Sequence, residues 1–244
     1  KEAEFQCEKY VGRKPEITSA AIYFLAARIA LFQEDWDEVI ATAKEFLAKN
    51  SSIHDLNSED ETLFGYVSSF EENSFCANNQ QLDEVVFGFG RNDGGYDYLA
   101  PNSPVLMYYE YGFHTSWTEE NSLIKLYDED DLRLQAYFQR RYNKSGSLRN
   151  PTYYAGQYQP NKYDNRSGTN YSSQAWRTPE LYLNLAEAYA QKANGISNEA
   201  IDLLNQLRIK KYKSGSPNAE KQASDFTTKD DLIKFIWPER LSLI

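Results

Sequence analysis

The sequence predicts a mainly helical protein in which pairs of amphipathic helices carry a long, loop-rich insertion. Apolar residues recur with helical spacing near both ends of the chain, helix start signals precede these repeats, and the helical period is lost across most of the middle. A hydrophobic content of 41% in 244 residues is typical of a globular protein. We expect one domain over 1–244, with helix pairs at 16–49 and 178–212, an insertion at 50–177 and the start of a further helical segment at 228–244.

The first predicted helix pair covers residues 17–32 and 36–47, with a break at Gln33-Glu34-Asp35. Each helix has an apolar stripe with the spacing of one helical face. The stripe of the first helix is Ala20, Phe24, Ala27 and Leu31, and that of the second is Trp36, Val39, Ile40, Ala43 and Leu47.

The second predicted pair begins at Thr178, which we expect to cap its first helix, with Pro179 at the first helical position. Asn194-Gly195 links the two helices and Ser197 opens the second. The two apolar stripes are Tyr182, Leu185, Ala186 and Tyr189, then Ala200, Leu203, Leu204 and Leu207. In both pairs the helix starts are about 19 residues apart, near half of the 34-residue tetratricopeptide period, so we predict a tetratricopeptide-like scaffold.

The middle of the chain is long, irregular and rich in tyrosine. Of the 19 tyrosines, 13 lie between Arg91 and Arg177, together with Trp117 and Trp176. A compact domain rarely carries so much irregular chain between helices unless the loops have a function. This segment is therefore the predicted ligand-binding region.

Aromatic rings with a polar edge suit the apolar faces of sugar rings, and neighbouring amide and carboxylate groups can bond to sugar hydroxyls. The predicted ligand-binding residues are Trp117, Tyr96, Tyr98, Tyr108, Tyr109, Tyr111, Asn92, Asp93 and Asn102. The alternative is that these tyrosines only pack loops onto the scaffold, with Tyr108 and Tyr109 as half-buried strand residues. We expect Trp36 and Trp176, on or beside the repeat helices, to lie in the core.

The composition gives no sign of catalysis, a metal site or a cofactor. A net charge of −10, from 36 acidic and 26 basic residues, argues against a nucleic-acid partner. His54 and His114 lie in no nucleophile or zinc pattern and are interpreted as loop hydrogen-bonding residues. The glycine turn 92–97 has acids four apart but is not an EF-hand.

The acidic run 128–131 raises the possibility of glycoside hydrolysis, but four adjacent acids more often form a solvated face or a helix start. We expect Asp131 to cap the helix that follows it. Cys7 and Cys76 lie in no motif spacing, so the sequence does not settle whether they pair. No run of about 18 apolar residues predicts a membrane span.

Several segments in order resemble the SusD/RagB family of outer-membrane nutrient-binding lipoproteins. The residues that carry this resemblance are 177–189 with Ala200 through Arg208, then Thr18–Gln33 with Asp35-Trp36, Asp83–Phe87 as a short strand, and Tyr127 with Asp131-Leu132-Arg133. Glu239-Arg240-Leu241 is similar to the start of that family's helix after the repeats. The resemblance covers nearly the whole chain.

The resemblance implies a surface lipoprotein that binds oligosaccharides or polysaccharides without catalysis and passes them to a SusC-like TonB-dependent outer-membrane transporter. Its glycan platform would lie in the loops after the short strand. The family's lipid-modified cysteine and its C-terminal tail have no counterpart here, so we expect an internal or C-terminal fragment, with a lipid anchor outside it. Peptide binding with the same transporter, a scaffold that binds only protein, and a glycosidase are the alternatives.

Overall fold

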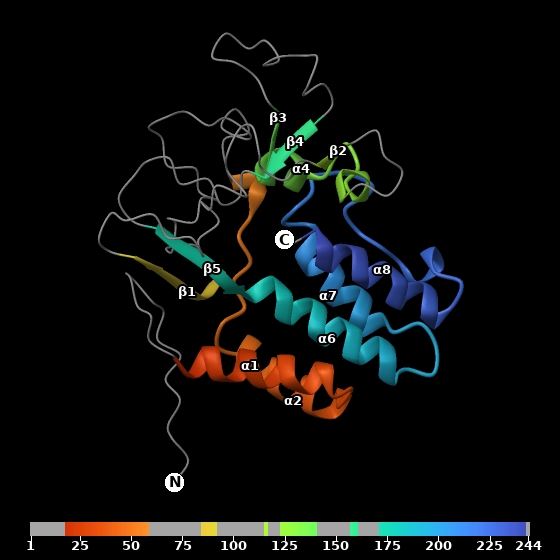
Figure 1. The fold of residues 1–244 in the computed structure, drawn as a ribbon. Helices are drawn as coiled ribbons and strands as arrows, with labels where there is room; N and C mark the ends of the chain where they lie inside the picture. Colours follow the sequence, from red (N-terminus) through yellow and green to blue (C-terminus); the bar gives the residue numbers. More distant parts are fainter. Residues whose placement is uncertain are drawn as a thin grey trace.

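The computed structural model describes residues 18–58, 84–91, 115–116, 123–140, 157–160 and 171–242. Within them lie five longer helices and several short strands (Figure 1). The helices are α1 (Ser19–Phe32), α2 (Trp36–Leu47), α6 (Thr178–Lys192), α7 (Asn198–Arg208) and α8 (Lys229–Leu241). A short helix, α4 (Leu132–Tyr137), lies in the middle of the chain. The protein is mainly helical, with a tetratricopeptide-like arrangement of helix pairs, as the sequence predicts.

The helix pair α1–α2 forms at the predicted residues. Thr18 caps α1 by accepting a hydrogen bond from the Ala21 N–H (3.2 Å), and Asp35 caps α2 by accepting one from the Glu38 N–H (3.1 Å). Glu34, in the break between them, has a left-handed backbone with φ of 57°. These local signals set the helix ends within two residues of the predicted ones.

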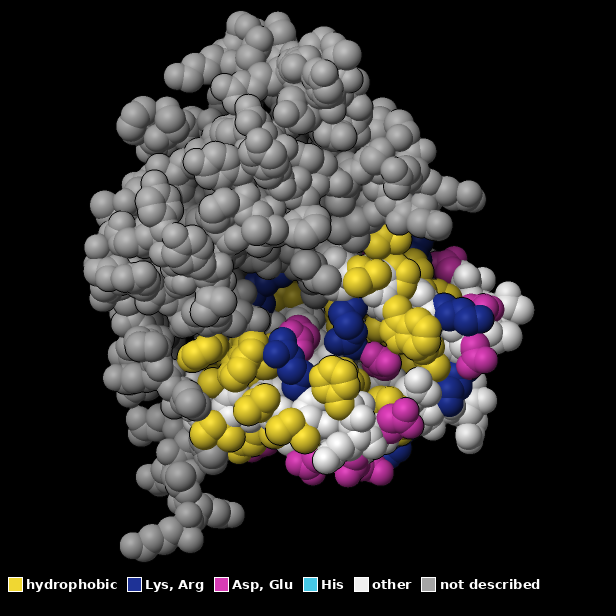
Figure 2. Space-filling view, in the orientation of Figure 1, with side chains coloured by type: hydrophobic (Ala, Val, Ile, Leu, Met, Phe, Trp, Pro, Cys, Tyr) yellow, Lys and Arg dark blue, Asp and Glu magenta, His cyan; other side chains and the backbone are white. Residues whose placement is uncertain are grey.

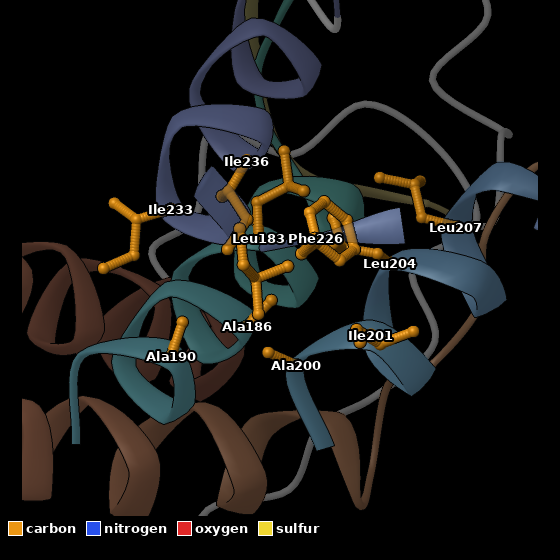
Figure 3. Close-up of a cluster of buried hydrophobic side chains, with 11 residues drawn as sticks. Leu183, Ala186, Ala190, Ala200, Ile201, Leu204, Leu207, Phe226, Ile233 and Ile236 are labelled. Atoms are coloured by element: carbon orange, nitrogen blue, oxygen red, sulfur yellow. The ribbon is translucent and has the colours of Figure 1, made fainter. Parts of the chain in front are cut away.

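Helix α6 is the centre of the scaffold, because it contacts α1 and α2 on one side and α7 and α8 on the other. Leu181 and Leu185 are buried with Phe24 of α1 and Phe46 of α2. The opposite face of α6 meets α7 and α8 in a second apolar cluster (Figure 3). That cluster contains Leu183, Ala186, Ala190, Ala200, Ile201, Leu204, Leu207, Phe226, Leu232, Ile233 and Ile236.

The start of α6 differs from the prediction. Helix α6 begins at Thr178, so the cap position is Arg177, whose backbone is extended (φ −135°, ψ 144°), and Pro179 is the second helical residue. Thr178 cannot cap because strand β5 runs directly into the helix, and the Thr178 N–H donates to the Glu84 carbonyl oxygen (2.8 Å). Ser197 does cap α7, accepting a hydrogen bond from the Ala200 N–H (3.2 Å).

The short strands form two small sheets. Strand β1 (Val85–Arg91) pairs antiparallel with β5 (Tyr171–Arg177), and β4 (Gln157–Pro160) lies between β2 (Thr115–Ser116) and β3 (Phe138–Arg140). All five strands lie inside the predicted insertion. The division of the chain into a single domain with these exact ranges stays a prediction.

Candidate ligand-binding region

The predicted binding segment is carried by the strand pair β1–β5. Val85 pairs with Arg177 at one end of this ladder and Arg91 pairs with Tyr171 at the other. The chain therefore leaves the ladder after Arg91 and returns to it at Tyr171, next to the point of departure. The first predicted ligand-binding residue, Asn92, directly follows β1.

All nine predicted ligand-binding residues lie outside the residues that the structure describes, so their arrangement stays a prediction. Trp117 directly follows Ser116, which pairs with Gln157 in the ladder between β2 and β4. The backbone on one side of Trp117 is thus part of a sheet. The glycine turn at 92–97, His114, Cys7 and Cys76 also lie outside the described residues.

The strand pair β1–β5 is attached to the helices by stacked aromatic rings. The Trp176 ring stacks on Phe24 of α1, with centroids 5.4 Å apart and planes 5° apart. The ring of Phe87 in β1 also contacts Trp176, and the centroids of these two rings lie 4.8 Å apart. Trp176 is therefore half-buried between sheet and scaffold, at the edge of the apolar core and not inside it as predicted.

Just before β1, Glu84 forms a buried ion cluster that joins both ends of the insertion to the scaffold. Its carboxylate accepts hydrogen bonds from Arg177 Nη1 (3.0 Å), Lys211 Nζ (3.2 Å) and the His54 N–H (2.9 Å). Glu84 and Lys211 have no exposed surface. Burial alone would raise the pKa of Glu84, but the charges of Lys211 and Arg177 and the His54 N–H outweigh it and lower this pKa to about 2.

A second buried cluster surrounds Arg133, at the start of α4. The Arg133 guanidinium donates to the Asp131 carboxylate (2.6 Å), to Glu239 Oε2 (2.8 Å) and to Ser242 Oγ (2.5 Å). Glu239 Oε1 accepts from Arg208 as well. Burial opposes the charge of Arg133, but Asp131 prevails and raises the pKa of this guanidinium. The cluster joins the middle of the insertion to α7 and α8.

Both clusters meet at the turn Arg208–Tyr212, which begins at the last residue of α7 and is called the anchor turn below. Lys211 belongs to the Glu84 cluster and Arg208 to the Arg133 cluster. The Lys211 carbonyl oxygen also accepts the Leu132 N–H (2.9 Å). The anchor turn thus binds the start and the middle of the insertion directly, and Glu84 links it to Arg177 at the end of the insertion.

Tyr212 packs between the two arginines of this region. The Arg208 guanidinium lies 4.3 Å from the Tyr212 ring centroid and that of Arg133 lies 5.8 Å from it. Burial, reinforced by the Asp131 charge, raises the pKa of Tyr212 to about 12. Its hydroxyl therefore stays protonated at neutral pH.

Two residues of the acidic run 128–131, Asp130 and Asp131, take part in this anchoring. Asp131 precedes α4 and accepts the Arg133 N–H (3.0 Å), as predicted for a helix cap, in addition to pairing with the Arg133 side chain. The Asp130 carboxylate accepts from Ser216 Oγ (2.8 Å). Among the described residues, no group of three or more His, Cys, Asp or Glu side chains is placed to hold a metal ion.

Sequence reasoning missed most of the anchor residues. Lys211 stands in the run Ile-Lys-Lys-Tyr, where nothing distinguishes it from its partly exposed neighbour Lys210. The acidic run predicts Asp131 as a helix cap, but Arg133 and Arg208 stand out only through the family resemblance, which gives no partner for either side chain. The sequence gives no local sign of the pair Glu84–Lys211, because these two residues are 127 residues apart.

Comparison with known proteins decides which family this scaffold represents. The model of the SusD family matches residues 91–242, which is more than half of the chain. The chain belongs to the SusD family. The matched range contains the tyrosine-rich segment, the Asp131–Arg133 element and helices α6 to α8.

Solved structures of SusD-like proteins share the fold. A SusD-like carbohydrate binding protein from Bacteroides vulgatus matches with a TM-score of 0.61 and 17% identity, over 97% of this chain and 44% of its own. A SusD-like protein from Bacteroides fragilis also has a TM-score of 0.61 and 17% identity, over 96% and 53%. Surface glycan-binding protein A from Bacteroides thetaiotaomicron, in complex with laminarihexaose, matches with a TM-score of 0.53 and 15% identity, over 94% and 53%.

This chain therefore spans about half the length of the solved SusD-like structures that it matches. No curated protein sequence matches it. Within the part that the structure describes, none of the helices is both long and apolar enough to cross a membrane.

Proposed function

We propose that this protein binds oligosaccharides or polysaccharides without catalysing a reaction, through aromatic side chains of the tyrosine-rich insertion. The observation that carries the proposal is the SusD family match over residues 91–242, because this range includes the part of the insertion in which 13 of the 19 tyrosines and Trp117 lie. The related glycan-binding protein in complex with laminarihexaose supports a sugar as the ligand.

The contacts among the described residues favour a rigid base for such a surface. Buried clusters centred on Glu84 and Arg133 hold three parts of the insertion on one turn of the scaffold. Loops that bind a ligand do so with less loss of conformational entropy when their ends are held by fixed elements. Stacking on rings, with a few hydrogen bonds to sugar hydroxyls, would supply the affinity.

Three buried carboxylates of the scaffold are not free to take part in glycoside hydrolysis. A glycosidase needs one carboxylic acid that donates a proton and a second carboxylate across the bond. Glu84, Asp131 and Glu239 are each paired with arginine or lysine inside the scaffold, so these three carboxylates are unsuited to that task.

A second part of the proposal concerns where the protein lies in the cell and which transporter it serves. We infer a surface-exposed lipoprotein of the outer membrane, anchored through a lipid outside the printed residues, that passes its glycan to a SusC-like TonB-dependent transporter. Membership of the SusD family is the support for this part. Copurification of the full-length protein with a SusC-like transporter of the same organism would test the partnership.

Affinity electrophoresis with a panel of polysaccharides, together with calorimetric titration of oligosaccharides and peptides, tests the ligand class. We expect at least one glycan to retard the protein and no peptide to bind with comparable affinity. Peptide binding alone would favour the alternative nutrient, and no binding to either class would favour a scaffold that binds only protein. Release of reducing sugar from any polysaccharide would contradict the non-catalytic role.

A further inference from the structure

Among the described residues, the strand pair β1–β5 is fixed to the helices mainly by buried charged side chains. Glu84, just before β1, and its partner Lys211 are fully buried, and Arg177 at the end of β5 is buried as well. The apolar side chains that the pair packs against α1, α2 and α6 are Val86 and Trp176, and both are only half-buried. The most deeply buried attachment of the pair is therefore ionic.

An attachment made of buried charges opens at a smaller cost than an apolar one of similar size. When Glu84 and Lys211 separate, they lose their mutual attraction, but both charges regain the hydration that burial removes. Apolar side chains that separate lose the whole free energy of their burial, because water offers them no compensating interaction. We therefore expect the contact between the strand pair and the helices to be weaker than the contacts among the helices.

Helices α6, α7 and α8 are held together by contacts of their own. The buried members of their apolar cluster come from these three helices and from Phe226, which precedes α8 (Figure 3). Arg240 of α8 pairs with Glu187 of α6 (2.6 Å), and Arg28 of α1 pairs with Glu180 of α6 at the same distance. Figure 2 shows charged side chains between the hydrophobic side chains of α1 and those of α8. These contacts use no residue of β1 or β5, so they persist when the strand pair opens.

The anchor turn is fixed from the scaffold side as well. The Arg208 guanidinium donates to two carbonyl oxygens of the connection between α7 and α8 (2.9 and 2.6 Å), and it pairs with Glu239 of α8. The Lys211 N–H donates to the Arg208 carbonyl oxygen (2.8 Å). The backbone of Lys211 therefore stays in place when Glu84 leaves it, whereas Glu84 has this partner only while α7 and α8 are folded.

We propose that the strand pair β1–β5 and the helices α6, α7 and α8 are two cooperative units, and that separation of Glu84 from Lys211 opens the first unit while the second stays folded. The predicted binding segment leaves the ladder after β1 and returns to it at β5, so this opening changes the support of that segment without unfolding the helices. Openings of this kind are detected as faster exchange of backbone amide hydrogens. The inference rests on the described contacts and not on the proposed glycan binding.

Hydrogen exchange of the full-length natural polypeptide, measured by mass spectrometry, tests the existence of the two units without any substitution. We expect the slowest amides of β1 and β5 to exchange at least about tenfold faster than the slowest amides of α6, α7 and α8. Equal rates in the two sets would overturn the inference, because all these amides would then open in one step.

Leu204→Ala tests whether the strand pair opens independently of the helices. Leu204 is buried in the cluster of α6, α7 and α8, so the cavity destabilises every state with folded helices, whether the strand pair is closed or open. We expect exchange at least about tenfold faster in α6, α7 and α8 and changed by less than about twofold in β1 and β5. The smaller change Ile201→Val in the same cluster replaces Leu204→Ala if that variant does not fold. Acceleration of both sets by the same factor would contradict the two units.

Lys211→Met tests the ion pair that closes the strand pair, and Lys210→Met is the matched control. Lys210 pairs with Asp55 at a partly exposed position. In Lys211→Met the buried Glu84 loses one of its cations, so we expect exchange of β1 and β5 to be at least about tenfold faster. The control should change this exchange by less than about twofold, since its pair is partly solvated. Unchanged exchange of β1 and β5 in Lys211→Met, or the same acceleration in both variants, would overturn the inference.

Discussion

Lys211 shows how strongly a single residue of the anchor turn depends on its surroundings. Its ammonium group is buried and donates to both Glu84 Oε2 and the His54 carbonyl oxygen (2.9 Å). The adjacent Lys210 instead forms a pair with Asp55 (2.7 Å) and is 41% exposed at its side chain. Two neighbours of the same type thus have different energetic roles.

Substitution of each lysine by methionine measures this difference. We expect Lys211→Met to lower the free energy of unfolding by about 3 to 5 kcal/mol, because the buried Glu84 charge loses a partner. Lys210→Met should cost less than about 1 kcal/mol, since its pair with Asp55 is partly exposed to solvent. Urea unfolding at pH 7 gives both values, and equal losses would contradict the described cluster.

The lowered pKa of Glu84 predicts how stability depends on pH. With a pKa of about 2 in the folded protein and an ordinary value of 4.5, the carboxylate stabilises the fold above about pH 4.5 and loses this contribution as the pH falls toward 2. The shift corresponds to about 3 kcal/mol at pH 7. Glu84→Gln should therefore be much less stable than the natural protein at pH 7 and nearly equal to it near pH 2.

Urea unfolding of Glu84→Gln at several pH values between 7 and 2 tests this expectation. The control is Glu38→Gln, at an exposed position on α2, whose stability should follow that of the natural protein throughout. If the difference between Glu84→Gln and the natural protein stayed constant over this range, Glu84 would not have the lowered pKa.

Helix ends show where the sequence predicts elements well and where it does not. Ser197 caps α7 because the chain before it is a free connection, so a local signal decides the outcome. Thr178 has the same local signal, yet the preceding residue, Arg177, is paired with Val85 in the β1–β5 ladder. A partner 92 residues away in sequence therefore decides how α6 begins, and helical periodicity carries no information about it.

Substitutions at these two residues separate a real cap from an apparent one. Ser197→Ala should lower the free energy of unfolding by about 1 kcal/mol, because the Ala200 N–H loses its acceptor. Thr178→Val, which keeps the shape of the buried side chain, should be neutral or slightly stabilising, since the Thr178 hydroxyl has no hydrogen-bond partner among the described residues. Chemical denaturation measures both, and a loss of about 1 kcal/mol for Thr178→Val would restore its predicted capping role.

At the scale of the molecule, the scaffold was predictable and its attachment to the insertion was not. The stripes of α1, α2, α6 and α7 repeat with a period that can be read within each helix. The Glu84 and Arg133 clusters join residues more than 90 positions apart, and buried charges look like surface charges in a sequence. The nine candidate binding residues follow from composition and family resemblance, neither of which carries the spatial relation between one side chain and another.

The central claim is that a rigid helical scaffold holds aromatic residues of the insertion as a glycan-binding surface. The affinity of Trp117→Ala for the glycan that retards the natural protein tests it most directly, with Trp237→Ala, a tryptophan of α8 outside the insertion, as the control. By analogy with aromatic stacking on nucleic-acid bases, we expect Trp117→Ala to weaken binding by about 1 to 3 kcal/mol, with Trp237→Ala unchanged. Equal affinities of both variants and the natural protein would contradict the assignment of Trp117, and failure of every glycan to bind the natural protein would contradict the claim itself.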